Sequence, residues 1–307
     1  MTNLPPIERW KKYLRYDPTR WLLETDDPSI QLWYQIDIAH RPEDSRAVID
    51  TRERVLYSDP VQAIFAAQDP LGFWNNPGSL TQPFFTATLW NLALLAELGI
   101  PRTSRRARNA CEFILQNFLN DDGTFVGYGT FEGLNGVNVG YLLHALAYFN
   151  LAHDERVLRA ARRLIQDAAE DSVHDLVYTA AIWAIQEIEL HDTTSITHRK
   201  SILDKLRTTL ARRKYILPIR FPQFDVEDPL FTLRVMTTTE LVHDACLSQM
   251  IEAIVAKQDE YARWRLEDAM NSLLTTPFER AGEPSRWITL NALRVITILV
   301  LNEKKED

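Results

Sequence analysis

The sequence predicts an all-α protein in which paired helices repeat along the chain. Apolar residues recur at three- and four-residue spacing nearly everywhere, which is typical of helices. Helices that are apolar on most sides alternate with amphipathic ones, and the former are expected to be buried. No segment shows sustained period-two alternation between turn signals, so the pattern does not favour a sheet.

The two types of helix follow one another in order. We expect strongly apolar helices over residues 87–98, 141–149, 178–188, 231–241 and 288–301. Amphipathic helices are expected over residues 104–119, 154–168, 197–213 and 244–257. Turn signals agree with these bounds, because Gly99 and Pro101 follow one apolar helix and Asp154 stands where an N-cap is expected.

A Gln near the end of the amphipathic helices marks a repeat. It recurs at intervals of roughly 50 residues, or twice that, a period that indicates stacked helical hairpins, at Gln68, Gln116, Gln166 and Gln258. About six such hairpins can close into a ring, which removes the exposed ends of an open stack. We therefore predict an α/α toroid, with inner and outer helix rings, over residues 28–307, preceded by an N-terminal helical extension over residues 1–27.

Composition limits the classes of partner. The chain has 307 residues, and its formal net charge of -8 argues against a nucleic-acid partner. Cys111 and Cys246 both lie in apolar helical patterns, so we expect buried free thiols in a reducing compartment. No signal peptide and no transmembrane segment is predicted, and a cytoplasmic location is expected. Peripheral contact with a membrane and the oligomeric state stay open.

Two loop segments share the pattern Gln-x3-small-x-Trp: Gln68, Gly72 and Trp74, and Gln258, Ala262 and Trp264. This pattern resembles the QW motif of the squalene-cyclase and prenyltransferase repeat family, and residues 116–125 contain a stretched version of it. Residues 282–294 resemble the ending of uncharacterised bacterial single-domain members. The resemblance implies that the Gln and Trp residues are scaffold and that the toroid cavity accepts an apolar, isoprenoid-like molecule.

The segment Asp-Val-Glu-Asp at residues 225–228 resembles the Asp-x-Asp-Asp motif of class II terpene cyclases. The middle acid of that motif protonates an alkene, so the resemblance implies Glu227 as proton donor, flanked by Asp225 and Asp228. The chemistry needs a carboxyl group that stays neutral against an apolar cavity. A second interpretation stays open, because Asp228 followed by Pro229 is also typical of a helix start.

Aromatic residues near the starts of the apolar helices are candidate ligand contacts. They could stabilise a carbocation or line an apolar pocket, although aromatic residues at helical spacing form a core more often than not. With one histidine, the predicted ligand-binding residues are Phe84, Phe85, Trp90, Tyr141, His174, Tyr178, Phe231 and Trp287.

Other chemistries find less support in the sequence. Asp244 and Cys246 have the Asp-x-Cys spacing of the zinc ligands in protein prenyltransferases, but no His follows His243, so we predict neither a metal nor a cofactor. A carbohydrate-active toroid would need two opposed carboxylates, with Asp225 or Asp228 facing Glu132. A non-catalytic toroid that binds a ligand or a protein is the main alternative to a cyclase.

Overall fold

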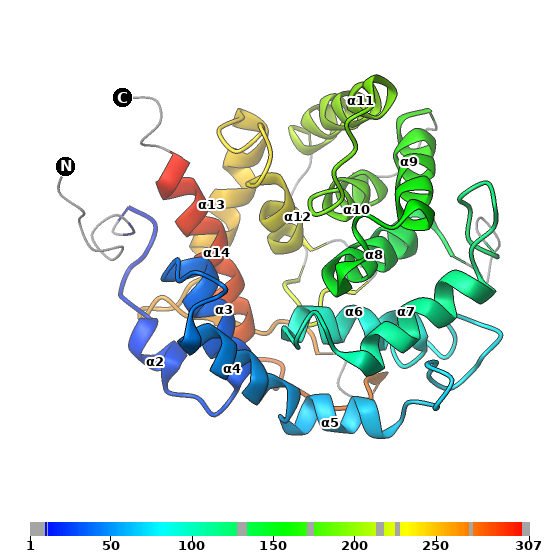
Figure 1. The fold of residues 1–307 in the computed structure, drawn as a ribbon. Coiled ribbons are helices and arrows are strands. Elements are labelled where there is room, and N and C mark those ends of the chain that lie inside the picture. Colours follow the sequence, from blue (N-terminus) through cyan, green and yellow to red (C-terminus); the bar gives the residue numbers. More distant parts are fainter. Residues whose placement is uncertain are drawn as a thin grey trace. The chain divides into compact units, whose positions relative to one another are not determined.

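The computed structural model describes residues 10, 12–127, 134–170, 175–212, 218–224, 228–269 and 273–302. The chain is mostly helical, which confirms the all-α class (Figure 1). It divides into two compact units. Unit 1 comprises Met1–Val55, Leu210–Met270 and Phe278–Asp307, and unit 2 comprises Leu56–Thr209 and Asn271–Pro277.

Unit 2 is a succession of helical hairpins. Loops join α5 (Asp59–Ala66) to α6 (Thr88–Leu98), α7 (Arg105–Asn117) to α8 (Gly136–Leu146), and α9 (Glu155–Glu170) to α10 (Asp175–Ala184). The one-turn π-helix η2 (Ala147–Leu151) extends α8, and α11 (Thr193–Leu210) leads out of the unit. Helices α6, α8 and α10 pack against one another in that order (Figure 1). They are the apolar helices that the sequence predicts to be buried.

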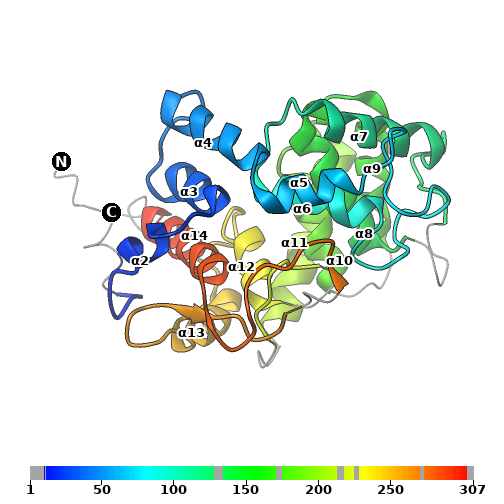
Figure 2. The same cartoon turned by 90° about the horizontal axis from the view of Figure 1, so that it is seen from below.

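Unit 1 joins both ends of the chain. Its N-terminal part contains α2 (Thr19–Leu23), α3 (Pro28–Trp33), the π-helix η1 (Tyr34–Ile38) and most of α4 (Arg46–Leu56). Its C-terminal part contains α12 (Pro229–Met236), η3 (Ala245–Leu247), α13 (Ser248–Ala256) and α14 (Arg286–Asn302). Helix α14 packs on α2, α3, η1 and α12 (Figures 1 and 2). Position 27, the expected end of an N-terminal extension, therefore lies inside this unit.

The described residues also contain one minimal sheet, which the sequence pattern does not predict. The two-residue strands β1 (Trp264–Arg265) and β2 (Pro284–Ser285) pair antiparallel, with Trp264 opposite Ser285. The pair closes the base of the loop between α13 and α14. It is too short to show the alternation on which strand prediction depends.

In unit 2, Gln68 and Trp74 fix the corner between α5 and α6. The buried indole Nε1 of Trp74 donates to the carbonyl oxygen of Ile64 at 2.7 Å, near the end of α5. The backbone N–H of Trp74 donates to Oγ1 of Thr88 at the start of α6, at 3.0 Å. Gln68 Nε2 donates to the carbonyl oxygen of Arg106 in the next hairpin, at 3.1 Å. The motif thus forms hydrogen bonds with groups at the ends of three helices, α5, α6 and α7.

The corner between α13 and α14 in unit 1 repeats this geometry. Trp264 Nε1 donates to the carbonyl oxygen of Ile254 at 2.7 Å, and its backbone N–H donates to Thr289 Oγ1 at 3.1 Å. Ala262 has a φ of 56°, in the left-handed region that Gly72 occupies with a φ of 105°. The predicted scaffold role of the Gln and Trp residues is confirmed by these matching contacts.

The other two Gln residues of the repeat, Gln116 and Gln166, lie near helix ends but are not corner residues. At the corner after α7, the backbones of Leu119 and Phe125 form an isolated antiparallel bridge, as those of Gln68 and Trp74 do at the corner after α5. Gln116 is exposed on α7. Gln166 is exposed inside α9, where its Nε2 donates to Glu170 at 3.0 Å. The helical hairpin recurs along the chain, but the Gln at its corner does not.

Cys111 and Cys246 are both buried free thiols, as predicted. Burial raises the pKa of the Cys111 thiol well above its ordinary value, so the group stays protonated. Within the described ranges, no helix combines the length and apolar character needed to cross a bilayer.

Removing the Gln68 amide should destabilise the fold, whereas removing the Gln116 amide should not. We expect Gln68→Ala to lower the free energy of unfolding by about 1–2 kcal/mol, because two backbone carbonyls lose a donor. Gln116→Ala, on an exposed helix face, should stay within about 0.5 kcal/mol of wild type. Urea unfolding followed by circular dichroism measures both, and equal effects would contradict the corner assignment.

Candidate functional site

The DVED segment lies directly before α12 in unit 1. Asp225 and Glu227 are outside the described residues, and Asp228 is the first described residue after them. Asp228 is the N-cap of α12: its Oδ1 accepts the N–H of Leu230 at 2.7 Å, and Pro229 is the first helical residue. The helix-start interpretation is therefore confirmed for Asp228, whereas the predicted roles of the other two acids stay predictions.

The Asp228 carboxyl is also buried, with 1% of the residue exposed. Its Oδ2 accepts the N–H of Arg220 at 2.8 Å, so both carboxyl oxygens are hydrogen-bonded. Burial raises the pKa of this carboxyl to about 6, and the backbone donors reduce that rise without cancelling it. The residue next to the predicted proton donor is thus an acid that is neutral in mildly acidic conditions.

Two ionic contacts anchor the chain that leads to DVED. Arg220 Nε lies 2.7 Å from Asp268 Oδ2, and the two residues form an isolated parallel bridge. The neighbouring N–H of Ile219 donates to Glu267 Oε2 at 2.8 Å, and Lys257 Nζ lies 2.6 Å from the same oxygen. The Arg220 amide that donates to Asp228 is therefore held in place from a second segment of unit 1.

An aromatic stack adjoins this anchored segment. The ring of Phe221 lies flat on that of Trp287, with centroids 4.0 Å apart and planes 11° apart. Phe278 meets Phe221 edge to face at 5.4 Å. Phe231, in the first turn of α12, and Trp287 are almost completely buried. These two predicted ligand contacts therefore belong to the core of unit 1.

The structure adds two half-buried acids that the sequence pattern does not single out, Asp27 and Glu279. Asp27 caps α3 by accepting the N–H of Ser29 at 2.8 Å. Glu279 accepts the N–H of Arg286 at 2.6 Å and the hydroxyl of Ser285, at the start of α14. Burial is the main cause that raises the pKa of both carboxyls, and the charge of Asp27 raises that of Glu279 further. Unit 1 thus has acids with raised pKa values at three helix starts, of which Asp228 is buried and the other two are half-buried.

Of the two half-buried acids, only Asp27 has neighbours in the sequence that mark it as a helix start. Asp27 is followed by Pro28, as Asp228 is followed by Pro229, and both pairs begin a helix. Glu279 lies in an irregular loop and caps a helix that begins seven residues later, so no local pattern marks it. Its proximity to Asp27 joins positions far apart in the chain, which only the fold reveals.

The start of α6 in unit 2 gathers three of the predicted ligand contacts. The rings of Phe84 and Phe85 lie 6.5 Å and 5.2 Å from that of Trp90, between centroids. Trp90 is buried and donates from Nε1 to the carbonyl oxygen of Thr81 at 3.0 Å. Phe84 is 53% exposed, and Phe85 has a φ of 63°, a strained value for a bulky residue. We call these three residues the aromatic triad.

Two further predicted contacts, Tyr141 and Tyr178, lie on α8 and α10. Tyr141 packs edge to face on Trp183 at 5.0 Å, and Tyr178 lies under the ammonium of Lys205 at 5.4 Å. Both tyrosines are buried in unit 2. His174 is outside the described residues.

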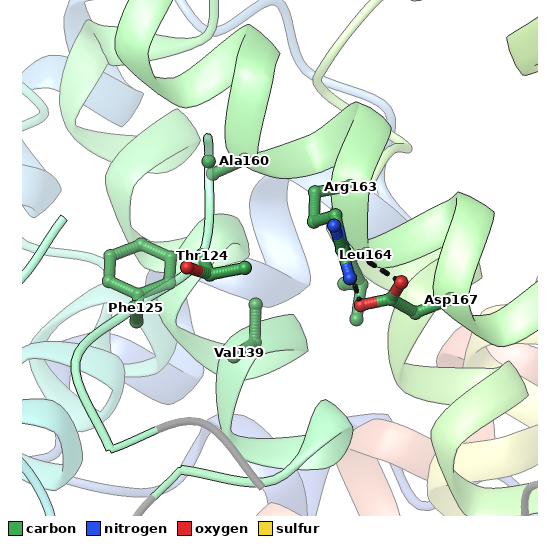
Figure 3. Close-up of a pocket in the computed structure, with 8 residues that line it drawn as sticks. Thr124, Phe125, Val139, Ala160, Arg163, Leu164 and Asp167 are labelled. Atoms are coloured by element: carbon green, nitrogen blue, oxygen red, sulfur yellow. Dashed lines mark hydrogen bonds and ion pairs between the residues drawn. The ribbon is translucent and has the colours of Figure 1, made fainter. Parts of the chain in front are cut away.

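Two hollows occur in the described part of unit 2. A cavity of about 10 Å³, with room for about one water molecule, lies behind the corner that contains Phe125, beside the ion pair of Arg163 and Asp167 (Figure 3). An open groove of about 740 Å³ runs along α11 and has a polar lining: Tyr178, Thr197, Lys200, Ser201, Asp204, Lys205, Thr208 and Thr209. The cavity is too small for an isoprenoid, and the groove is open and lined by polar and charged residues, so neither hollow is the enclosed apolar pocket that such a ligand requires.

The zinc-like pair has a structural role. Asp244 caps η3 by accepting the N–H of Cys246 at 2.9 Å. Among the described residues, no three His, Cys, Asp or Glu side chains lie close enough together to hold a metal ion.

Comparison with known proteins does not assign this site. No protein-family model matches the chain. No curated protein matches it significantly either.

Ionisation of Asp228 should destabilise unit 1 as the pH rises. Its carboxyl has a higher pKa in the folded chain than the ordinary value of 3.8, so its stabilising effect is complete below pH 3.8 and is lost as the pH rises through about 6. We expect a loss of about 3 kcal/mol of unfolding free energy over this window. Asp228→Asn should remove that decline, as measured by urea unfolding between pH 4 and pH 7.

Asp192 is expected to show the opposite pH dependence of stability from Asp228. It accepts the N–H and the hydroxyl of Ser195, and these hydrogen bonds lower its pKa. The stability that Asp192 contributes is therefore present above pH 3.8 and is lost as the pH falls through its lowered pKa. A pH profile of Asp228→Asn that matches wild type would contradict the buried-acid assignment.

Proposed function

We propose that this protein binds an apolar, isoprenoid-like molecule in the cavity of an α/α toroid. The fold part of the proposal is supported by the two matching corners, at Trp74 in unit 2 and at Trp264 in unit 1. These corners follow the motif whose resemblance to the squalene-cyclase and prenyltransferase repeats implies the toroid.

The meeting of the two chain ends supports a closed ring. Helix α14, the last in the chain, packs on α2 and α3, the first described ones (Figure 2). In an open stack of hairpins, the first and last elements would lie at opposite ends. A ring brings them together and leaves a lumen lined by the apolar helices.

The aromatic triad carries the binding proposal. A left-handed backbone at a bulky residue such as Phe85 costs about 1–3 kcal/mol, and here it leaves Phe84 half exposed. A packed core does not need such an arrangement, because core aromatic residues are covered. The exposed ring of Phe84, beside the half-buried Phe85 and the buried Trp90, offers flat apolar area to a ligand, and its π face would attract a carbocation.

A catalytic version of the function is the second candidate, favoured by the burial of Asp228. A carboxyl whose pKa is raised to about 6 indicates a poorly solvated environment at Asp228, the residue that follows Glu227 in the chain. Since both oxygens of Asp228 are occupied by backbone donors, Asp228 is suited to fix the segment rather than to donate the proton. Glu227 is then the proposed donor to the alkene of a linear isoprenoid.

Removing the exposed ring of the triad should weaken ligand binding. We expect Phe84→Ala to lower the affinity for farnesol or squalene about fivefold to thirtyfold, which corresponds to about 1–2 kcal/mol of lost aromatic contact. Tryptophan fluorescence titration measures the affinity, and native mass spectrometry of the purified protein detects a co-purifying lipid. Leu71→Ala, another exposed apolar position of unit 2, should leave the affinity unchanged. Failure of wild type to bind either compound would overturn the proposal.

Replacing the proposed proton donor should stop turnover without unfolding the protein. Glu227→Gln keeps the shape of the side chain but removes the acidic proton, so no cyclic product should form from squalene. Gas chromatography of extracted products measures the yield, and circular dichroism checks the fold. An unchanged yield would exclude Glu227 as the proton donor, whereas no cyclic product from wild type would leave the non-catalytic binding function.

A further inference from the structure

The open groove along α11 of unit 2 has the size of a small-molecule site (Figure 1). Its volume of about 740 Å³ lies within the range of about 300–1,000 Å³ that ligand pockets occupy. The lining residues of α11 recur three or four positions apart, so they share one face of the helix. From Thr197 to Thr209 this face extends over about 18 Å. The groove is therefore long enough for an extended polar ligand.

Three threonine hydroxyls in the groove are oriented as hydrogen-bond acceptors. Oγ1 of Thr197, Thr208 and Thr209 each donates to the carbonyl oxygen four residues earlier in α11, at 2.8, 3.0 and 3.1 Å respectively. A hydroxyl has one proton to donate and two lone pairs that accept. Because the helix uses the proton, these exposed oxygens face an incoming ligand as acceptors. A ligand with several hydroxyl donors fits this face.

Two lysines give the groove positive charge. Lys205 is fixed in place: its Nζ donates to the carbonyl oxygen of Ala169 in the last turn of α9, at 2.6 Å, and lies 5.4 Å from the ring centroid of Tyr178. Lys200 is exposed and forms no ion pair with another described residue. Lys205 is thus a fixed charge, whereas the Lys200 ammonium can turn toward an anion.

The excess of positive charge is small. Asp204, a carboxylate in the described lining, lies 2.9 Å from the Arg207 guanidinium, which offsets its charge. The partial negative charge at the C-terminal end of α9 offsets part of the charge of Lys205. Lys200 remains, and the neighbouring Ser201 adds a hydroxyl that can donate. This balance suits one carboxylate better than a doubly charged phosphate.

We propose that the groove along α11 binds a sugar acid, either free or as one unit of a short oligosaccharide. Lys200 and Ser201 bind the carboxylate, and the ring hydroxyls donate to Oγ1 of Thr208 and Thr209. This site is a second one, additional to the isoprenoid-like ligand of the proposed function, and it does not depend on that ligand.

Titration of the full chain with four probes tests the ligand class. Isothermal titration calorimetry and saturation-transfer NMR should detect binding of galacturonate. Galactose lacks the charge and acetate lacks the hydroxyls, so each should bind at least about tenfold more weakly. Trigalacturonate distinguishes the two sources: tighter binding than galacturonate assigns an oligosaccharide, and equal binding assigns the free sugar acid.

Two results of these titrations would refute the sugar acid. One is the absence of saturable binding of both galacturonate and trigalacturonate. The other is acetate binding as tightly as galacturonate, because the groove would then recognise charge alone, as a surface for an acidic peptide would.

Substitutions in the groove test the assigned contacts. Lys200→Ala removes the ammonium, so the affinity for galacturonate should fall about tenfold. Thr208→Val keeps the shape of the side chain but removes the acceptor oxygen, so the affinity should fall about threefold. Both positions are exposed, and circular dichroism should show an unchanged fold.

Arg105→Ala is the matched control for Lys200→Ala. Arg105 is an exposed cation of α7 in the same unit and is outside the lining of the groove, so its removal should leave the affinity for galacturonate unchanged. Wild-type affinity in Lys200→Ala, or an equal loss in Arg105→Ala, would contradict the site.

Discussion

The arrangement of this protein depends on how the polar backbone groups at helix ends are satisfied where one helix turns into the next. A buried carbonyl without a donor costs about 1–3 kcal/mol, so each corner needs a donor that is rigid and placed by the turn itself. The indole of Trp74 serves Ile64 in this way, and that of Trp264 serves Ile254. Because each Trp also bonds a threonine at the start of the next helix, the turn fixes both partners of a hairpin.

Burial and capping oppose each other at the acids of unit 1. Backbone donors at a helix start favour a carboxylate, whereas removal from water favours the neutral acid. At Asp228, Asp27 and Glu279 removal from water is the larger effect, so each pKa lies above its ordinary value. This balance gives a structural cap some of the properties of an active-site acid. The same carboxyl can therefore serve the fold and adjust the environment of a neighbouring residue.

The sequence predicts the helices well because periodicity is a local property. The apolar helix expected at residues 288–301, for example, occurs as α14, and the start of α12 follows from Asp228 and Pro229. The positions of the corner residues are harder to predict, because at the corner after α7 Leu119 stands in place of Gln, while Gln116 lies nearby in sequence. The acid at Glu279 depends on a long-range approach to Asp27, which no local pattern encodes.

The corner after α7 is held together differently from the corners at Trp74 and Trp264. With Leu119 and Phe125 in the positions of Gln and Trp, it lacks both the amide and the indole donor that brace the other two, and a water-sized gap lies behind it. In its described part, this corner is held instead by backbone pairing and by hydrogen bonds of Thr124 with Asn120 and Asp122 in the same loop. Under an applied load, the described part of this corner therefore relies on bonds within its own loop rather than on an indole that reaches back to the preceding helix.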